Sequence, residues 1–326
     1  MSSSSTTPSA CSEPHTVSVQ LPDLLSSCTP FELRANRHCR SVSQASEAWL
    51  RDAGLNLGLE WKAIKVGLWA ALCYPGADLT QLRLAVDFLS LLVFEQERER
   101  DHDGIGCSDG DENEVFDLIS DRLSRVAYKS PAWYMRFHRS MRAYRDARRR
   151  LNSLDSTCIP DLETYVDLRR NASGLRMVFH LIEYAGGLNL PERASSHPIL
   201  NKLTDQACDL IAWSEDAVSC AKGMTPSSRL NIVPVLMKDR NCSFGSALTY
   251  VGTLVKQSAD AFLATERLFA ACVDPAVMND DTRRYVRGLR DCIAGSVNWL
   301  YETERYLGTK GNEVRAFGWV FVPVLD

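Results

Sequence analysis

Apolar residues recur at three- and four-residue steps along most of the chain, which is the period of a helix with one buried face. This pattern predicts helices over ten segments: Ala45–Leu55, Leu59–Cys73, Leu79–Arg100, Glu114–Ala127, Ala132–Leu151, Asp161–Arg170, Gly174–Ala185, His197–Lys222, Ser246–Cys272 and Asp280–Leu307. Proline and glycine separate several of them. No stretch alternates strongly enough between apolar and polar residues to predict a sheet. The fold class is therefore predicted to be all-α.

The N-terminal segment differs in composition from the rest. Residues 1–27 are rich in Ser, Thr and Pro, and we expect an arm that is mobile at its start, although Val17–Leu25 is apolar enough to pack on the body. Residues 28–326 are expected to form one domain. Met1–Pro14 lacks the basic start and apolar run of a signal peptide, and no apolar run is long enough to cross a bilayer. We therefore expect a cytoplasmic protein without a membrane span.

Two predicted helical segments, Lys62–Cys73 and Leu84–Phe94, are apolar almost all round. Such helices lie inside a bundle or line a pocket within it. An apolar central cavity with polar groups at its mouth suits a small molecule. The 11 cysteines show no Cys-x-x-Cys spacing and are interpreted as small buried hydrophobes. The net charge of −4 argues against a nucleic-acid partner.

Polar residues lie on one face of the predicted helix His197–Lys222. Glu215, Ser219 and Lys222 follow one another at steps of four and three residues, so they are neighbours on its surface. A carboxylate, a hydroxyl and an ammonium on one stripe suit a divalent cation and the polyanion that it carries. The alternative is a polar stripe that faces solvent.

The helix Leu79–Arg100 becomes acidic at its C-terminal end, where the helix dipole disfavours negative charge. Glu95 and Glu99 stand one turn apart there, which indicates a cation site. The alternative is a solvated helix end with Glu–Arg pairs.

Two residue pairs that contain arginine are further candidates for phosphate binding. Arg169-Arg170 is followed by Gly174, and Arg305-Tyr306 follows the apolar helix that carries Trp299. The planar guanidinium can donate two hydrogen bonds to phosphate oxygens. Taken alone, the first pair is better explained as a generic helix end capped by glycine, and the second is common by chance; the Leu181-Ile182-Glu183-Tyr184-Ala185 run that follows the first pair favours the phosphate-binding interpretation.

Together and in this order, these segments resemble fungal class I sesquiterpene cyclases, a family of terpene synthases. The resemblance begins at Tyr74-Pro75 and extends to the Arg305-Tyr306 pair. In place of the family's first metal motif, Asp-Asp/Glu-x-x-Asp, the chain has Glu95-Gln96-Glu97-Arg98-Glu99. In place of the second, Asn/Asp-Asp-x-x-Ser/Thr-x-x-Lys/Arg-Glu, it has Glu215-Asp216-x-x-Ser219-x-x-Lys222-Gly223. Glu replaces Asp at both ends of the first motif, and the last ligand of the second is absent.

The resemblance implies a class I helical bundle that cyclises farnesyl diphosphate with Mg²⁺. It implies that the metal is held by Glu95, Glu99, Glu215 and Ser219. It assigns diphosphate binding and catalysis to Arg169, Lys222, Arg305 and Tyr306. The aromatic residues expected to line the substrate cavity and stabilise carbocations are Trp69, Phe88, Phe179 and Trp299. An aromatic at helical spacing is more often plain core.

Because Gly223 has no side chain to offer a metal, two alternatives stay open. One is a cyclase fold that binds an isoprenoid without ionising it. The other is an enzyme that rearranges an isoprenoid without metal.

Two further patterns have simpler interpretations. Asp101–Glu112 nearly fits a calcium-binding loop, but Ile105 occupies a ligand position, so an acidic loop beside the site is expected. Arginines recur every three residues from Arg136 to Arg148, as in some nucleic-acid-binding helices. The interleaved Trp133 and Phe137 favour an ordinary amphipathic helix.

Overall fold

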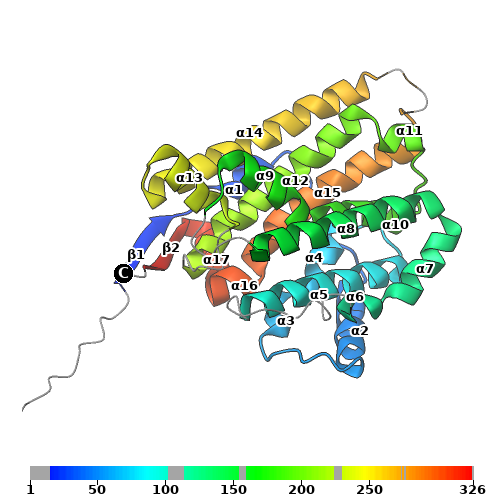
Figure 1. Cartoon of the computed structure of the whole chain (residues 1–326), viewed down its shortest axis with the longest axis horizontal. Coiled ribbons are helices and arrows are strands. Elements are labelled where there is room, and N and C mark those ends of the chain that lie inside the picture. Colours follow the sequence, from blue (N-terminus) through cyan, green and yellow to red (C-terminus); the bar gives the residue numbers. More distant parts are fainter. Residues whose placement is uncertain are drawn as a thin grey trace, which may run out of the picture.

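The computed structural model describes residues 15–101, 114–153, 159–223, 230–272, 274 and 277–324. Long helices run alongside one another and form a bundle (Figure 1). The helices of the first half are α1 Leu24–Cys28, α2 Cys39–Asp52, α3 Trp61–Ile64, α4 Val66–Cys73, α5 Leu79–Asp101, α6 Glu114–Asp117, α7 Ser120–Lys129 and α8 Pro131–Ser153. Those of the second half are α9 Leu162–Ala172, α10 Leu175–Gly186, α11 Glu192–Ser195, α12 Pro198–Ser219, α13 Ile232–Arg240, α14 Phe244–Ala270, α15 Asp280–Glu302, α16 Glu304–Leu307 and α17 Gly311–Phe317, with 3₁₀ turns η1 Cys220–Lys222 and η3 Gly308–Lys310. The all-α prediction is confirmed.

The core is formed where the predicted apolar helices pass through the bundle. Every residue of α4 except Leu68 is buried, and Leu84–Val93 of α5 are all buried. α4 lies directly against α15 because Gly295 allows close approach: a Cβ there would stand 2.7 Å from the carbonyl carbon of Leu72. The interpretation of these two segments as interior helices is therefore confirmed.

The predicted helix Glu114–Ala127 is split into α6 and α7, and two other predicted helices are interrupted at places that matter for the site. The segment Leu59–Cys73 breaks at Lys65, whose φ of 56° separates α3 from α4. The indole Nε1 of Trp299 donates to the carbonyl oxygens of Ile64 and Lys65 at 3.0 and 3.1 Å, so the freed backbone groups are satisfied. The segment Asp280–Leu307 breaks at Thr303, whose side chain caps α16 by accepting from the Arg305 N–H at 3.1 Å.

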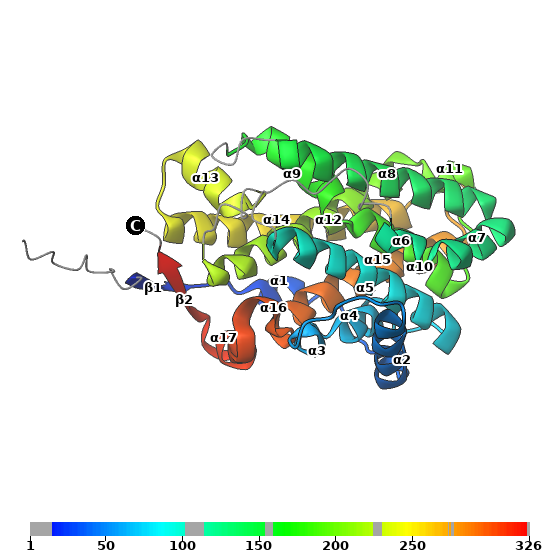
Figure 2. The ribbon, with the colours of Figure 1, turned by 60° about the horizontal axis from the view of Figure 1, so that its bottom comes forward.

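The expectation of no sheet is wrong. β1 His15–Gln20 pairs antiparallel with β2 Trp319–Val324, in a register that sets Val19 opposite Val320. These two valines are buried, whereas Trp319 and Phe321 of β2 are exposed. Figures 1 and 2 show the sheet at one end of the bundle, where the first and last described segments meet. Thr16–Leu21 alternates between polar and apolar residues, but its partner strand lies about 300 residues away, so the pattern did not reveal the pairing.

The N-terminal arm is ordered over the part that the structure describes. After β1, the chain forms α1, in which Asp23 caps the helix by accepting from the Ser26 N–H at 3.0 Å and Leu24 is fully buried. Val17–Leu25 thus lies on the body, as its apolar residues suggest, and Met1–Pro14 lies outside the described residues.

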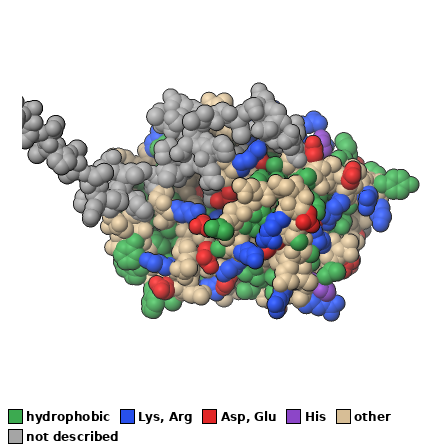
Figure 3. All heavy atoms as spheres, turned by 90° about the horizontal axis from the view of Figure 1, so that it is seen from below, with side chains coloured by type: hydrophobic (Ala, Val, Ile, Leu, Met, Phe, Trp, Pro, Cys, Tyr) green, Lys and Arg blue, Asp and Glu red, His purple; other side chains and the backbone are tan. Residues whose placement is uncertain are grey.

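Other surface features follow the sequence pattern. α8 buries Trp133, Phe137 and Tyr144, which confirms an amphipathic helix. The face in Figure 3 carries interspersed basic and acidic side chains with hydrophobic ones between them. No described helix has the length and apolar character needed to cross a membrane. Most of the acidic segment Asp101–Glu112 lies outside the described residues.

Candidate active site

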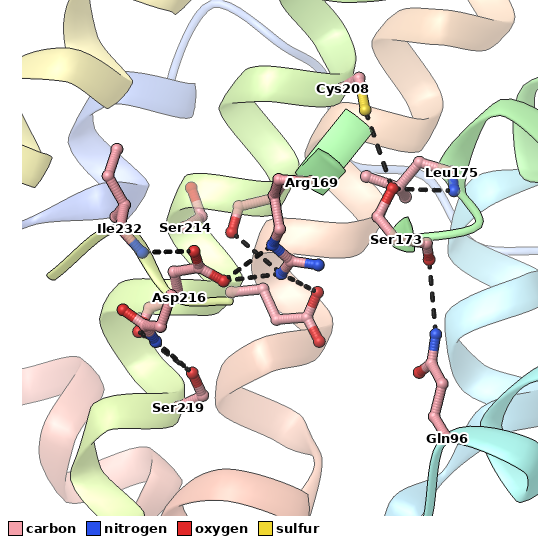
Figure 4. Close-up of polar contacts among 12 residues, drawn as sticks. Gln96, Arg169, Ser173, Leu175, Cys208, Ser214, Asp216, Ser219 and Ile232 are labelled. Atoms are coloured by element: carbon pink, nitrogen blue, oxygen red, sulfur yellow. Dashed lines mark hydrogen bonds and ion pairs between the residues drawn. The ribbon is translucent and has the colours of Figure 1, made fainter. Parts of the chain in front are cut away.

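Arg169, at the end of α9, binds two adjacent carboxylates on α12. Its Nη2 donates to Asp216 Oδ1 at 2.7 Å and to Glu215 Oε2 at 3.0 Å, and its Nε also donates to Asp216 Oδ1 at 3.0 Å (Figure 4). Burial acts to lower the pKa of Arg169, but the charges of Asp216 and Glu215 outweigh it and raise the pKa well above its ordinary value. Arg169 therefore stays charged and fixes α9 to α12.

Asp216 is the buried partner in this arrangement. Its other carboxylate oxygen, Oδ2, accepts from the Tyr165 hydroxyl and from the Ile232 N–H at 2.8 Å. Burial raises the pKa of Asp216 above its ordinary value, although Arg169 and Tyr165 counteract the rise. With its hydrogen bonds directed to these groups, Asp216 acts as the structural anchor, and the neighbouring Glu215 faces the remaining polar residues.

Glu215 joins α12 to α16. The Tyr306 hydroxyl donates to Glu215 Oε1 at 2.6 Å, while Arg169 holds Oε2. The ring of Tyr306 meets Trp299 edge to face, with centroids 6.3 Å apart. The predicted residues Arg169, Glu215, Tyr306 and Trp299 are therefore brought together from α9, α12 and the consecutive helices α16 and α15.

Arg305 joins α16 to the acidic end of α5. Its Nε donates to Glu97 Oε1 at 2.7 Å and its Nη2 to Gln96 Oε1 at 3.2 Å, and its side chain is only 2% exposed. Glu95, also buried, accepts from Arg98 Nη2 at 2.9 Å. Glu99 lies on the last turn of α5, but its side chain lies outside the described part of the structure.

α12 ends at Ser219, and the chain continues as η1, so Glu215, Ser219 and Lys222 do not share one α-helical stripe. Ser219 Oγ donates to the Asp216 carbonyl oxygen at 3.1 Å and accepts from Asn231 Nδ2 at 3.1 Å. A hydroxyl has two acceptor lone pairs, and the hydrogen bond from Asn231 uses one of them. Lys222 is exposed on the turn.

Gly223 follows with φ 98° and ψ 158°, a conformation that only glycine adopts readily. The backbone therefore needs glycine at the position where the family carries an acid.

The four aromatic candidates fall into two groups. Trp69 stacks on Trp299 with centroids 4.9 Å apart, and Trp69 Nε1 donates to Ser296 Oγ at 2.9 Å. This pair lies beside Tyr306, next to the polar network. Phe88 is fully buried and lies among other aromatic rings, with Phe137 at 5.2 Å. Phe179 is likewise buried on α10.

Arg148 of α8 is close enough to the charged residues of the site for their charges to act on it, and sequence reasoning missed it. Burial lowers its pKa to about 10, and the charges that act on it are those of Arg169, Glu95, Arg305 and Glu215. Its neighbour Ala147 packs against Leu168 and Ala172 of α9, and partly buried Leu151 and Leu230 pack against this small cluster. Because arginines recur every three residues in this helix, the sequence does not distinguish Arg148 from the others.

The donor set fits a hard cation in kind, because carboxylate and hydroxyl oxygens are what Mg²⁺ binds. Glu95 on α5 and Glu215 and Ser219 on α12 supply such oxygens. As they stand, the described residues include no group of three acidic, histidine or cysteine side chains placed to hold a metal ion. Glu95 and Glu215 each bind a guanidinium instead, that of Arg98 and that of Arg169.

A helical bundle with acidic helix ends, an Arg-Tyr pair and an arginine at a helix break, all meeting at one place, defines a class I terpene-cyclase-like site. The family model for terpene synthase family 2, C-terminal metal binding, matches residues 77–261. Sesquiterpene synthase Agr1 of Cyclocybe aegerita is 32% identical over 97% of this chain and 96% of its own. Sesquiterpene synthase 6 of Postia placenta is 30% identical over 91% and 93%. The chain belongs to the terpene synthase family.

Solved structures agree on the fold. A cucumene synthase variant superposes with a TM-score of 0.72, at 22% identity, over 85% of this chain and 99% of its own. Likeness at this identity shows the shared helical bundle, and the chemistry must be argued from the site.

Proposed function

We propose that the protein is a sesquiterpene synthase that ionises farnesyl diphosphate and cyclises the resulting cation. The observation that carries the proposal is the convergence of Arg169, Arg305 and Tyr306 on acidic residues of α5 and α12. The relatives named sesquiterpene synthases, which match nearly the whole chain, support the choice of a C15 substrate.

In this proposal the basic residues bind the diphosphate. Without substrate, Arg169 and Arg305 are neutralised by Glu215 and Glu97, so a diphosphate that carries several negative charges competes with these carboxylates for the guanidinium donors. The Tyr306 hydroxyl donates to an oxygen of the leaving group in the same way, and Lys222 contributes a point charge from the turn. These groups are fixed before the reaction, so they stabilise the charge as it develops on the leaving diphosphate.

We assign the metal to Glu95, Glu99, Glu215 and Ser219, and we take the ion to be Mg²⁺. Bound there, Mg²⁺ would supply Lewis-acid stabilisation of the diphosphate. Each Glu in place of the family's Asp moves its carboxylate by roughly 1–1.5 Å, and waters can complete the coordination that Gly223 leaves open.

The hydrocarbon part is assigned to the apolar interior. Trp69 and Trp299 lie just inside the polar network, where a ring face can stabilise a nearby carbocation by cation–π attraction. Phe88 and Phe179 lie deeper among apolar helices, and we propose that they shape the far wall of the substrate cavity. We further propose that the enzyme works in the cytoplasm.

The test is incubation of the purified protein with farnesyl diphosphate in Mg²⁺ and in EDTA, with volatile products identified by gas chromatography–mass spectrometry. The proposal predicts a terpene with Mg²⁺ and none with EDTA. Equal product in EDTA would favour a metal-independent enzyme. No product, with a melting temperature still raised by farnesyl diphosphate, would favour a binding protein that has lost ionisation.

A further inference from the structure

One face of α5 contacts the break between α9 and α10 at two points. Leu92 and Gln96 stand one turn apart on this face. Gly174, at the break, has φ 77°, and a Cβ there would lie 2.9 Å from Leu92 Cδ2, so glycine is required both by the conformation and by the approach of α5. One turn further along α5, Gln96 reaches the preceding residue, Ser173.

The Gln96 amide bridges two groups that have no contact of their own. Its Oε1 accepts from Arg305 Nη2 at 3.2 Å, and its Nε2 makes a longer contact of 3.4 Å with the Ser173 carbonyl oxygen (Figure 4 shows the second contact). The orientation of the amide is fixed by its partners, because the guanidinium only donates and a carbonyl only accepts.

The break itself is held in one shape by Ser173. Its Oγ accepts from the Leu175 N–H at 3.2 Å and donates to the Arg170 carbonyl oxygen at 3.3 Å. The first turn of α10 is closed by Met177 and Val178, whose N–H groups both donate to the Gly174 carbonyl oxygen. None of these hydrogen bonds uses the Ser173 carbonyl oxygen, which accepts from Gln96.

We propose that Gln96 is a positioning residue that links Arg305 to the Ser173 carbonyl, so that diphosphate bound by Arg305 sets the position of the α9–α10 break. The inference rests on the proposed function, since it takes Arg305 as a diphosphate ligand. It also explains an amide at this place in the acidic segment. An ionised carboxylate can accept from Arg305 but cannot donate to a carbonyl, whereas an amide does both.

The first experiment needs no turnover. Amide hydrogen exchange of the segment 172–178 is measured by mass spectrometry with and without inorganic diphosphate and MgCl₂. In the wild type, we expect the ligand to slow exchange at the break at least twofold. In Gln96→Glu, which keeps the acceptor and loses the donor, and in Gln96→Leu, which loses both, the slowing disappears. Gln257→Glu, an exposed change on α14, is the matched control and retains it.

The outcomes separate positioning from binding. Melting-temperature titration with inorganic diphosphate is expected to give affinities within threefold of the wild type for both Gln96 variants. An affinity that falls tenfold would make Gln96 a binding residue and overturn the proposal. The proposal would also be overturned if diphosphate slowed amide exchange at the break in Gln96→Glu as much as in the wild type. In that case the ligand would act on α9 through Arg169 and not through Gln96.

The second experiment reads the reaction. With farnesyl diphosphate, Gln96→Glu is expected to lower kcat at least tenfold, to change KM less than threefold and to raise the share of minor products. Unchanged kcat and products would contradict positioning. If the wild type makes no terpene at all, the proposed function fails, and the exchange experiment still decides whether Gln96 connects bound diphosphate to the break.

Discussion

Replacing Arg169 by methionine removes the charge that joins α9 to α12 and keeps most of the apolar stem. Its side chain is 11% exposed, and that of its partner Asp216 is 3% exposed. The change leaves a buried carboxylate without its cation. Removing one partner of a buried ion pair typically costs about 3–5 kcal/mol. Tyr165 and the Ile232 N–H still donate to Asp216, so we expect the lower end, about 3 kcal/mol.

This loss is measurable as a change in melting temperature. For a chain of 326 residues, an unfolding entropy of about 2.1 cal/mol/K per residue gives roughly 0.7 kcal/mol/K. A loss of about 3 kcal/mol therefore lowers the melting temperature by about 4 °C. Circular dichroism gives this temperature, and urea denaturation gives the free energy of unfolding.

The pH dependence makes the prediction specific to Asp216. Burial already raises its pKa above the ordinary 3.8, and loss of Arg169 removes a charge that lowers it. A carboxyl whose pKa is higher in the folded state contributes stability that is present below the unfolded pKa and lost as the pH rises through the folded pKa. Arg169→Met is therefore expected to be less destabilised at pH 5 than at pH 7.5.

Arg51→Met is the control, because Arg51 is 52% exposed and contacts Glu47 at 3.5 Å. It should change stability by less than about 0.5 kcal/mol at either pH. A drop in the melting temperature below 1 °C for Arg169→Met, or an equal drop at both pH values, would refute the view of Asp216 as an anchored buried carboxylate.

Two further changes test the geometry of the site. Gly174→Ala places a Cβ on a residue with φ 77° and 2.9 Å from Leu92 Cδ2. Urea denaturation should show that the free energy of unfolding falls by about 2–3 kcal/mol. A fall below about 0.5 kcal/mol would contradict the close approach of α5. Tyr306→Phe removes the hydroxyl that donates to Glu215 at 2.6 Å. Steady-state kinetics should show kcat/KM lower by roughly tenfold to a hundredfold. An unchanged kcat/KM would contradict a role for Tyr306 in diphosphate binding.

Much of the fold was predictable because helical periodicity is a local signal. Helices such as α8, α10 and α14 begin and end within a few residues of the predicted limits. The breaks at Lys65 and Thr303 were not predictable, because they depend on tertiary contacts and local caps. At Lys65, the indole of Trp299, more than 230 residues away, satisfies the interrupted backbone. The sheet depends in the same way on a distant partner.

In the site, too, some features were predictable from the sequence and others depend on tertiary contacts. Residue order along the chain was sufficient to nominate Arg169, Glu215, Arg305 and Tyr306. In the structure Arg169 and Tyr306 both bind Glu215, and the Arg305 guanidinium lies 5.3 Å from the centre of the Tyr306 ring. Their partners were not predictable. The sequence assigns no role to Glu97 and Gln96, yet both bind Arg305. Nothing in the sequence distinguishes Arg148 from the other arginines of its helix.

From the sequence, Gly223 is interpreted as a lost metal ligand. The structure adds that the backbone conformation at this position favours glycine. Its φ of 98° with ψ of 158° would strain any other residue by about 1–3 kcal/mol. Putting the family's glutamate back at this position is therefore expected to disturb the turn that carries Lys222.

The central claim is that this network ionises a prenyl diphosphate. The most direct measurement is the release of inorganic diphosphate from farnesyl diphosphate by the wild type, with Mg²⁺ and with EDTA, beside Arg305→Met. The account predicts release with Mg²⁺, none above background with EDTA, and a fall of at least about a hundredfold in the variant. Equal release from the wild type in Mg²⁺ and EDTA, or undiminished release from Arg305→Met, would contradict it.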